Sequence, residues 1–136
     1  MEKLKIHEIR SADKVLIAMI FPMTNQGTPV QYIGNEETYL QVGLMHRGSQ
    51  DPVRAHKHNK ITRVIPRTQE VLILLTGSMN ISFFDLQDNP IETVNVVAGH
   101  VCMLLQGGHG IDFLEDSELI EVKQGPHIGA SDRTLL

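Results

Sequence analysis

The sequence predicts an all-β protein, folded as a barrel or a sandwich of short antiparallel strands. Apolar runs recur at intervals of roughly 8–12 residues, which is the spacing typical of strands in such folds. Eleven glycines and six prolines, together with asparagines, interrupt the 136 residues at short intervals. No run with helical periodicity is of comparable strength. These observations favour strands joined by turns over a helical fold.

Nine runs are predicted as strands, because each is rich in apolar side chains and is bounded by turn-forming residues. They cover residues 15–21, 38–45, 53–58, 70–75, 79–85, 92–97, 100–105, 111–115 and 118–123. The stretch DLQDNP (85–90) is predicted to form a turn between two of them, since Asp, Asn and Pro each favour turns. With no low-complexity linker and no obvious repeat, residues 1–136 are interpreted as one domain.

Composition and charge argue against several classes of protein. A hydrophobic content of 41% with 21% charged residues is typical of a globular chain. The formal net charge of −4 argues against a nucleic-acid binder, which needs a basic face. No apolar run approaches the roughly 20 residues of a membrane span, and residues 15–21 are predicted as a strand rather than a signal peptide. The single cysteine, Cys102, lies in an apolar run, so we expect a core position and a reducing, cytoplasmic compartment.

A cluster of histidines and one glutamate indicates a metal site. On a strand, His56 and His58 project from the same face, about 6.6–7 Å apart, and Arg54 shares that face. Two imidazoles held in this way can chelate one ion. Glu70 opens the next apolar run, where a carboxylate is costly unless it is paired, solvated or bound to a cation. His109 follows two glycines after a further pair of strands.

Three imidazoles and one carboxylate are ligands that suit a divalent transition metal. The set fits Fe(II), Mn(II), Ni(II), Co(II) or Zn(II), and it leaves coordination positions for water or substrate. The sequence therefore predicts one such ion per chain without choosing the element. The remaining histidines are expected to be structural or exposed; they are His7, His46, His100 and His127.

At these residues the chain resembles the cupin superfamily. The first cupin motif is matched by Gly48, His56-Lys57-His58, Glu70 and Gly77. The second motif is matched by Gly99, Gly107 and His109, with Leu105 where proline is usual. The resemblance covers about residues 40–123 and implies a double-stranded β-helix, or jelly-roll barrel, with the metal inside the barrel mouth.

The first motif departs from the family pattern in its spacing. Eleven residues separate His58 from Glu70, a longer gap than is common in cupins, and Gly48 lies slightly far from His56. The first hairpin therefore carries an insertion, and whether residues 59–69 form a lid is left open. Gln69 would replace Glu70 if the strand slipped by one residue, although such a slip would turn every apolar side chain of the strand over.

Charged residues beside the motif predict how a ligand is held. The basic residues of 54–67 form either a solvated loop or a lip that attracts an anionic ligand; they are Arg54, Lys57, Lys60, Arg63 and Arg67. Glu121 and Lys123 share one strand face, where they line a pocket or pair on the surface. We take Arg54 and Lys123 as candidates for substrate binding, and Glu121 and His46 as candidates for the general base.

Three classes of function are compatible with such a site. The first is an isomerase or epimerase that acts on a small, polar, anionic carbohydrate-like substrate. The second is a non-haem-iron dioxygenase, and the third is a non-enzymatic module that binds a small ligand. The EVKQGP string (121–126) is similar to cupins of sugar-nucleotide and surface-polysaccharide metabolism. The RAHKHNK stretch (54–60) is similar to the sugar 3,4-ketoisomerases among them, which need no metal.

The run EVLILL (70–75) predicts a further packing partner. It is apolar on both faces, so one face meets the core and the other needs either a second sheet layer or another subunit. Cupins resemble one another in pairing through outer sheet faces, and the resemblance therefore implies a homodimer.

Overall fold

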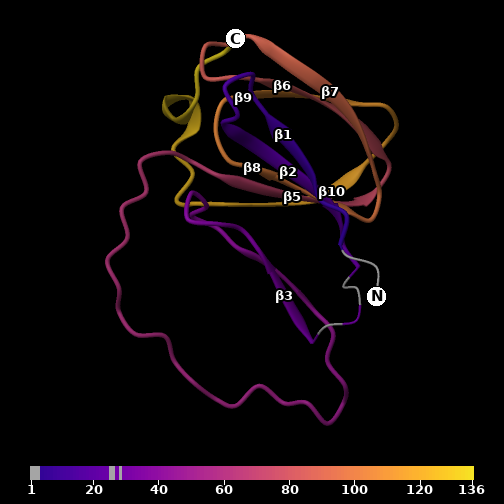
Figure 1. Ribbon diagram of the computed structural model, residues 1–136, viewed down its shortest axis with the longest axis vertical. Coiled ribbons are helices and arrows are strands. Elements are labelled where there is room, and N and C mark those ends of the chain that lie inside the picture. Colours follow the sequence, from indigo (N-terminus) through magenta and orange to yellow (C-terminus); the bar gives the residue numbers. More distant parts are fainter. Residues whose placement is uncertain (1–3, 25–26, 28) are drawn as a thin grey trace.

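A computed structural model describes residues 4–24, 27 and 29–136, and within these the fold is all-β. Figure 1 shows the arrangement of the strands and of one short 3-10 helix. The elements are β1 (His7–Arg10), β2 (Leu16–Pro22), β3 (Val30–Ile33), β4 (Val42–Met45), β5 (Glu70–Thr76), β6 (Ser78–Phe84), β7 (Pro90–Val97), β8 (His100–Leu104), β9 (Gly108–Phe113), β10 (Glu118–Lys123) and η1 (Gly129–Asp132). In this part of the chain, no helix is long and apolar enough to cross a membrane.

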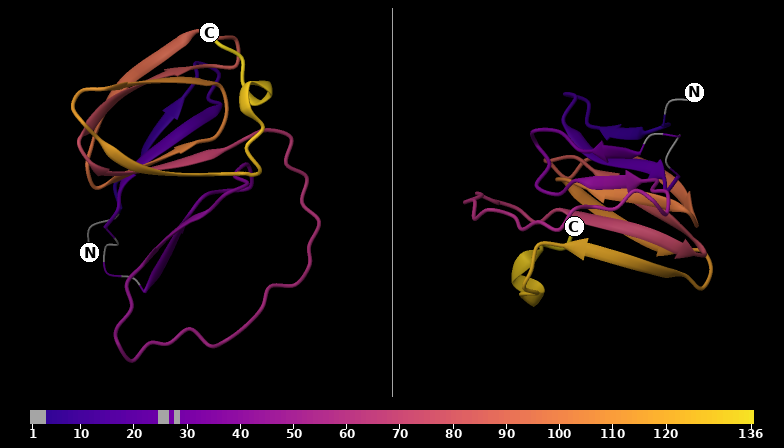
Figure 2. Two further views of the ribbon diagram at one scale, coloured as in Figure 1. Left: turned by 180° about the vertical axis from the view of Figure 1, so that it is seen from behind. Right: turned by 90° about the horizontal axis from the view of Figure 1, so that it is seen from below.

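The strands form three antiparallel sheets. The largest has the order β1-β2-β8-β5-β10, the second has the order β7-β6-β9, and β3 pairs with β4 in the third. The two larger sheets face each other with the main core between them (Figure 2). Leu72 and Leu74 of β5 meet Ile81 and Phe83 of β6 in this core, and all four side chains are at most 2% exposed.

The β3–β4 hairpin covers the outer face of the five-stranded sheet. Val71 and Ile73 of β5 point to that face, where a second apolar cluster includes Ile33 of β3 and Leu44 of β4. This packing explains why the run 70–75 is apolar on both faces. The sequence predicts either a second sheet layer or another subunit against this run. In the structure, the β3–β4 hairpin of the same chain is that second layer.

Most of the predicted strands are confirmed. Their side chains alternate along the chain, and one set of them packs between the two facing sheets. The turn at 85–90 is confirmed as well: Asp85 accepts hydrogen bonds from the backbone N–H groups of Gln87 and Asn89, and Asp88 has a φ of 66°. The run 38–45 forms a strand only over Val42–Met45. The short strands β1 and β3 were not predicted.

The prediction of a strand at residues 53–58 is wrong for this structure. Residues 52–67, which we call the arm, are all exposed and form no strand. Among the described residues, no backbone group of the arm is hydrogen-bonded to another strand. The arm instead forms a wide arc outside the sheets (Figure 1).

The position of the arm explains why the closed barrel that the resemblance implies is not seen. Among the described strands, β9 is hydrogen-bonded only to β6, and β10 is hydrogen-bonded only to β5. Each therefore has one unpaired edge. The two facing sheets thus stay open between β9 and β10.

Candidate functional site

A cleft of about 1370 Å³ opens between the two facing sheets. Its floor contains Leu72 of β5 and Ile111 of β9. Among the strand residues that line it, the ionisable ones are Glu70 of β5, His109 of β9, and Glu121 and Lys123 of β10. The C-terminal residues 131–136 line the same cleft. Apolar walls with a few convergent ionisable groups are typical of a small-molecule site.

The register of β5 against β10 turns the charged side chains into the cleft. Lys123 lies opposite Glu70, and Glu121 lies opposite Leu72. Because Leu72 is buried in the inner core, residues at alternate positions and their cross-strand partners share the inner face. The prediction that Glu121 and Lys123 share one face is confirmed, and that face lines the cleft.

His109 and Glu70 approach each other from different sheets. His109 lies opposite the buried Phe83 in the pairing of β6 with β9, so its side chain also faces inward. Its Nε2 is 3.7 Å from Oε2 of Glu70, and the two side chains are 35% and 21% exposed. The structure thus brings together two of the four residues that the sequence predicts as metal ligands.

Gln69 does not take the place of Glu70. It is 1% exposed and belongs to the opposite side of the sheet. Its side-chain oxygen accepts a hydrogen bond from the backbone N–H of Tyr39 at 2.6 Å, and its side-chain nitrogen donates to the carbonyl of Glu37 at 3.0 Å. Its own backbone N–H donates to Oε1 of Gln124 at 2.7 Å. Gln69 therefore fixes the register that directs Glu70 inward.

Lys123 and Glu121 form an ion pair on the inner wall. Nζ of Lys123 is 3.1 Å from Oε1 of Glu121, and the side chains are 28% and 45% exposed. The hydrogen bond to Glu121 and the charge of that carboxylate raise the pKa of Lys123 above its usual value, and the charges of Glu70 and Asp132 add to this effect. The ammonium group is therefore a permanent positive charge beside two carboxylates.

His56 and His58 lie on the arm and do not line the cleft. Their ring centroids are 5.2 Å apart with an interplanar angle of 69°, so the two imidazoles do project to the same side. Nδ1 of His56 is 2.8 Å from the carbonyl oxygen of Arg54, to which it donates. That bond leaves Nε2 of His56 with its lone pair available to an ion.

The predicted ligands thus form two separate pairs, one on the arm and one in the cleft. Among the described residues, no three His, Cys, Asp or Glu side chains lie close enough together to hold a metal ion. Two other candidates also lie outside the cleft. Arg54 is exposed on the arm, and His46 is exposed just after β4, where its backbone N–H donates to Pro29.

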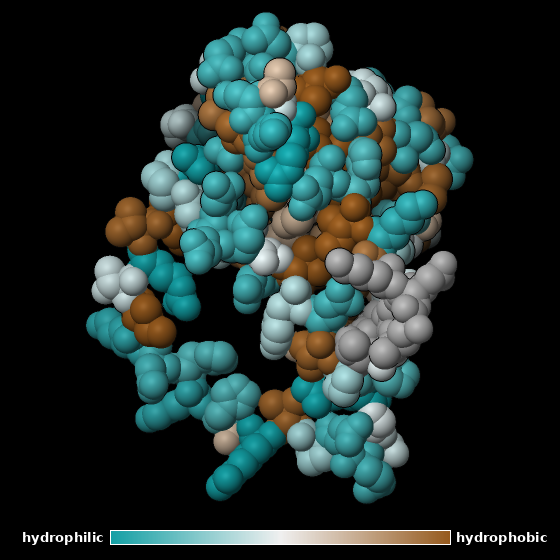
Figure 3. Space-filling model, in the orientation of Figure 1, coloured by the Kyte–Doolittle hydropathy of each residue, from teal (hydrophilic) through white to brown (hydrophobic). Residues whose placement is uncertain are grey.

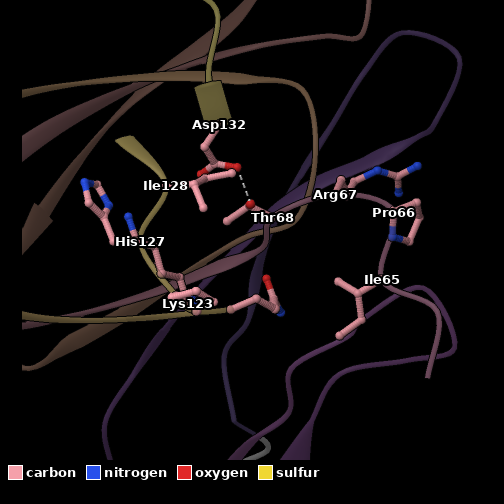
Figure 4. Close-up of a pocket in the computed structure, with 11 residues that line it drawn as sticks. Ile65, Pro66, Arg67, Thr68, Lys123, His127, Ile128 and Asp132 are labelled. Atoms are coloured by element: carbon pink, nitrogen blue, oxygen red, sulfur yellow. Dashed lines mark hydrogen bonds between the residues drawn. The ribbon is translucent and has the colours of Figure 1, made fainter. Parts of the chain in front are cut away.

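A side pocket of about 320 Å³ adjoins the base of the arm. Figure 4 shows that Thr68 and Asp132 meet across it, with Oγ1 of Thr68 donating to Oδ1 of Asp132 at 2.6 Å. Lys123 lines this pocket as well as the cleft, and His127 lies on the same wall. Sequence reasoning missed Thr68, His127 and Asp132 as pocket residues, because no local pattern connects positions 64 residues apart.

The chemistry of the cleft is that of a site for a small polar molecule. It offers an imidazole and a carboxylate in contact, a second carboxylate, and an ammonium group that attracts an anion. In comparisons with known proteins, no protein-family model, no curated protein and no solved structure matches the chain.

Proposed function

We propose that the chain is a metal-binding enzyme of the cupin type that isomerises or epimerises a small, anionic, carbohydrate-like molecule. The observation that carries this proposal is the contact between His109 and Glu70 at 3.7 Å. These residues come from the two separate sequence motifs of the cupin resemblance, and they meet on the inner wall of an open cleft between two facing antiparallel sheets. Two facing antiparallel sheets are also the framework of a jelly roll.

The donor atoms are of the types that bind a divalent transition metal. Glu70 offers an anionic oxygen, while His109, His56 and His58 offer imidazole nitrogens, with the His56 tautomer already set by its bond to Arg54. A bound ion would supply a Lewis acid that polarises a carbonyl and stabilises negative charge on neighbouring oxygens. One chain assembles only half of this set at the cleft.

Lys123 and Glu121, which also line the cleft, have roles in binding and proton transfer. The ammonium of Lys123 attracts a phosphate or carboxylate of the substrate and orients it against the inner wall. Glu121 accepts the proton from the carbon beside the substrate carbonyl, which is the step that isomerisation and epimerisation share. Leu72 and Ile111 line the apolar floor that keeps bulk water from the reacting carbon.

Elemental mass spectrometry of the purified, tag-free protein tests this proposal. We expect about one transition-metal ion per chain, lost in His109→Ala and retained in His46→Ala, which replaces an exposed histidine outside the cleft. Protein that holds no stoichiometric metal, even after each ion has been added back, would contradict the proposal.

A metal-free reaction is the second candidate, and one observation favours it. Within one chain only Glu70 and His109 of the four predicted ligands reach the cleft, and an imidazole beside a carboxylate is itself a proton-transfer pair. The similarity of RAHKHNK to the metal-independent sugar 3,4-ketoisomerases points the same way. Sugar-phosphate binding that survives complete removal of metal with EDTA would select this candidate.

A further inference from the structure

The arm presents apolar and backbone groups that have no partner in the described structure. Val53, Ile61 and Val64 are 62%, 62% and 83% exposed, although apolar side chains of this size are usually buried. No backbone group of residues 52–67 is paired with a strand in the described part of the chain. Figure 3 shows the arm standing clear of the body of the molecule, with open space between them.

The edge of β9 is the complementary feature. Among the described residues, β9 pairs with β6 on one side and with nothing on the other. Its inward-facing residues include His109, Ile111 and Phe113, which lie opposite buried residues of β6, yet Phe113 is 52% exposed. An open strand edge beside an uncovered apolar face is a template for the addition of another strand.

The charges of the two features are opposite. The arm contains five cationic side chains and no carboxylate; they are Arg54, Lys57, Lys60, Arg63 and Arg67. The segment from β9 to β10, residues 108–123, contains five carboxylates and one lysine; they are Asp112, Glu115, Asp116, Glu118, Glu121 and Lys123. Opposite charges on two surfaces favour their association and set its orientation.

The base of the arm is fixed to its own chain. Thr68 is hydrogen-bonded to Asp132, and Gln69 is buried and bonded to Tyr39 and Glu37. From this base the arm runs outward, away from the two facing sheets (Figure 1). A second copy of the chain carries the same β9 edge and the same acidic segment 108–123, so it offers a complete acceptor for the arm.

We propose that the arm of each copy adds as a strand to the β9 edge of a second copy, in a reciprocal two-fold dimer. In this proposal His56 and His58 lie on the inner face, with His109, and alternation along the added strand then places Lys57 on the outer face, with Gly110. Each site therefore combines two residues of one chain with His56 and His58 of the partner subunit. The shared metal site rests on the proposed function, whereas the exchange of arms does not.

A pair of engineered cysteines tests the exchange without reference to metal. In Lys57→Cys/Gly110→Cys, both new side chains lie on the outer face of the strand pair, and a Cβ at Gly110 meets no atom within 4 Å. We expect a disulfide that links two chains, seen on a non-reducing gel as a band at twice the 15.2 kDa of one chain. If the added strand is shifted by two residues, Lys57 lies beside Asp112 instead of Gly110. The second pair, Lys57→Cys/Asp112→Cys, tests that register.

Thr93→Cys provides the matched control for Gly110→Cys. Thr93 and Gly110 both lie opposite Ser82 of the central strand β6, on the same face of the three-stranded sheet but at its two opposite edges. Lys57→Cys/Thr93→Cys is expected to form no disulfide. A disulfide within one chain for the first two pairs, or monomeric protein with no disulfide in either, would overturn the exchange.

A mixing experiment then separates the shared site from the exchange itself. His56→Ala/His58→Ala has an intact cleft, and Glu70→Gln/His109→Ala has an intact arm. Unfolded together and refolded, they should regain about one quarter of the wild-type metal content, since about half of the dimers are mixed and each has one complete site. No recovery would overturn the shared site. A double-cysteine variant with no other substitution that forms the interchain disulfide but holds no metal would support the exchange of arms. It would refute the proposed function alone.

Discussion

Nε2 of His109 lies 3.7 Å from Oε2 of Glu70, and the two residues belong to strands of different sheets. The contact exists because Leu72 and Leu74 turn one face of β5 into the core, while Ile111, opposite the buried Ile81, turns the same face of β9 as His109 toward it. Core packing thus determines the position of both ionisable groups. A carboxylate and an imidazole are placed at the open end of the cleft by the apolar residues behind them.

Glu70→Gln tests whether this contact serves binding or stability. Both side chains are partly exposed, so we expect the free energy of unfolding to change by less than about 1 kcal/mol. Metal affinity should fall at least about tenfold, because an anionic ligand becomes neutral. Urea denaturation and metal titration measure the two effects.

Glu92→Gln is the matched control for that substitution. Oε2 of Glu92 is 3.5 Å from Nε2 of His7, a similar pair that lies outside the cleft. We expect its metal affinity to equal that of the wild type. Equal losses of affinity in both variants would show that the Glu70 contact is not specific to the site.

Gly77→Ala should be strongly destabilising. Gly77 has a φ of +88°, and a Cβ there would lie 2.1 Å from Oγ of Ser117 and 2.7 Å from the carbonyl of Asp116. Gly99→Ala is the comparison, since Gly99 has a φ of +86° but no atom within 4 Å of the added Cβ. We expect a loss of about 1 kcal/mol for Gly99→Ala and about 3 kcal/mol or more for Gly77→Ala, measured by denaturant unfolding. Equal losses would show that backbone strain alone explains both.

Lys123 gives the stability a dependence on alkaline pH. Its pKa is raised above the usual 10.5, chiefly by the hydrogen bond to Glu121. Because the folded-state pKa exceeds the unfolded one, this stabilisation is fully present below pH 10.5 and is lost as pH rises through the folded-state pKa. In thermal scans from pH 8 to pH 12, Glu121→Gln should therefore lose less stability than the wild type above pH 10.5. Parallel curves for the two proteins would contradict this assignment.

Cys102 should be inert to thiol reagents in the folded protein. Its side chain is fully buried, and burial, reinforced by the charge of Glu70, raises the thiol pKa to about 12. At pH 8 the thiol is therefore neutral and inaccessible. We expect no reaction with a disulfide reagent until urea unfolds the chain, when one thiol per chain should react. Rapid labelling of native protein would refute the core position.

Local patterns predicted the inner strands well. The run 70–75 is continuously apolar because both of its faces are buried, and the run 79–85 alternates because one of its faces is buried. Each pattern is present within its own segment. β1 was missed because it has a single buried residue, Ile9, among three exposed ones. The contact between Thr68 and Asp132 leaves no local signal, since it joins segments that are distant in the sequence.

The arm shows why the candidate site was predicted only in part. The sequence predicts that His56 and His58 project to the same side, and the 5.2 Å separation of their rings agrees with this. A strand, however, forms only where its backbone is hydrogen-bonded to a neighbouring strand. The sequence does not specify that neighbour for residues 53–58. The predicted positions of Glu70 and His109 needed only the packing of their own strands, so both face the cleft as expected.

Native mass spectrometry of the wild-type protein at micromolar concentration tests the exchange of arms and the metal site together, because it reports the number of chains and of metal ions in the same particle. We expect a dimer that carries about one transition-metal ion per chain. A monomer of 15.2 kDa would contradict this expectation.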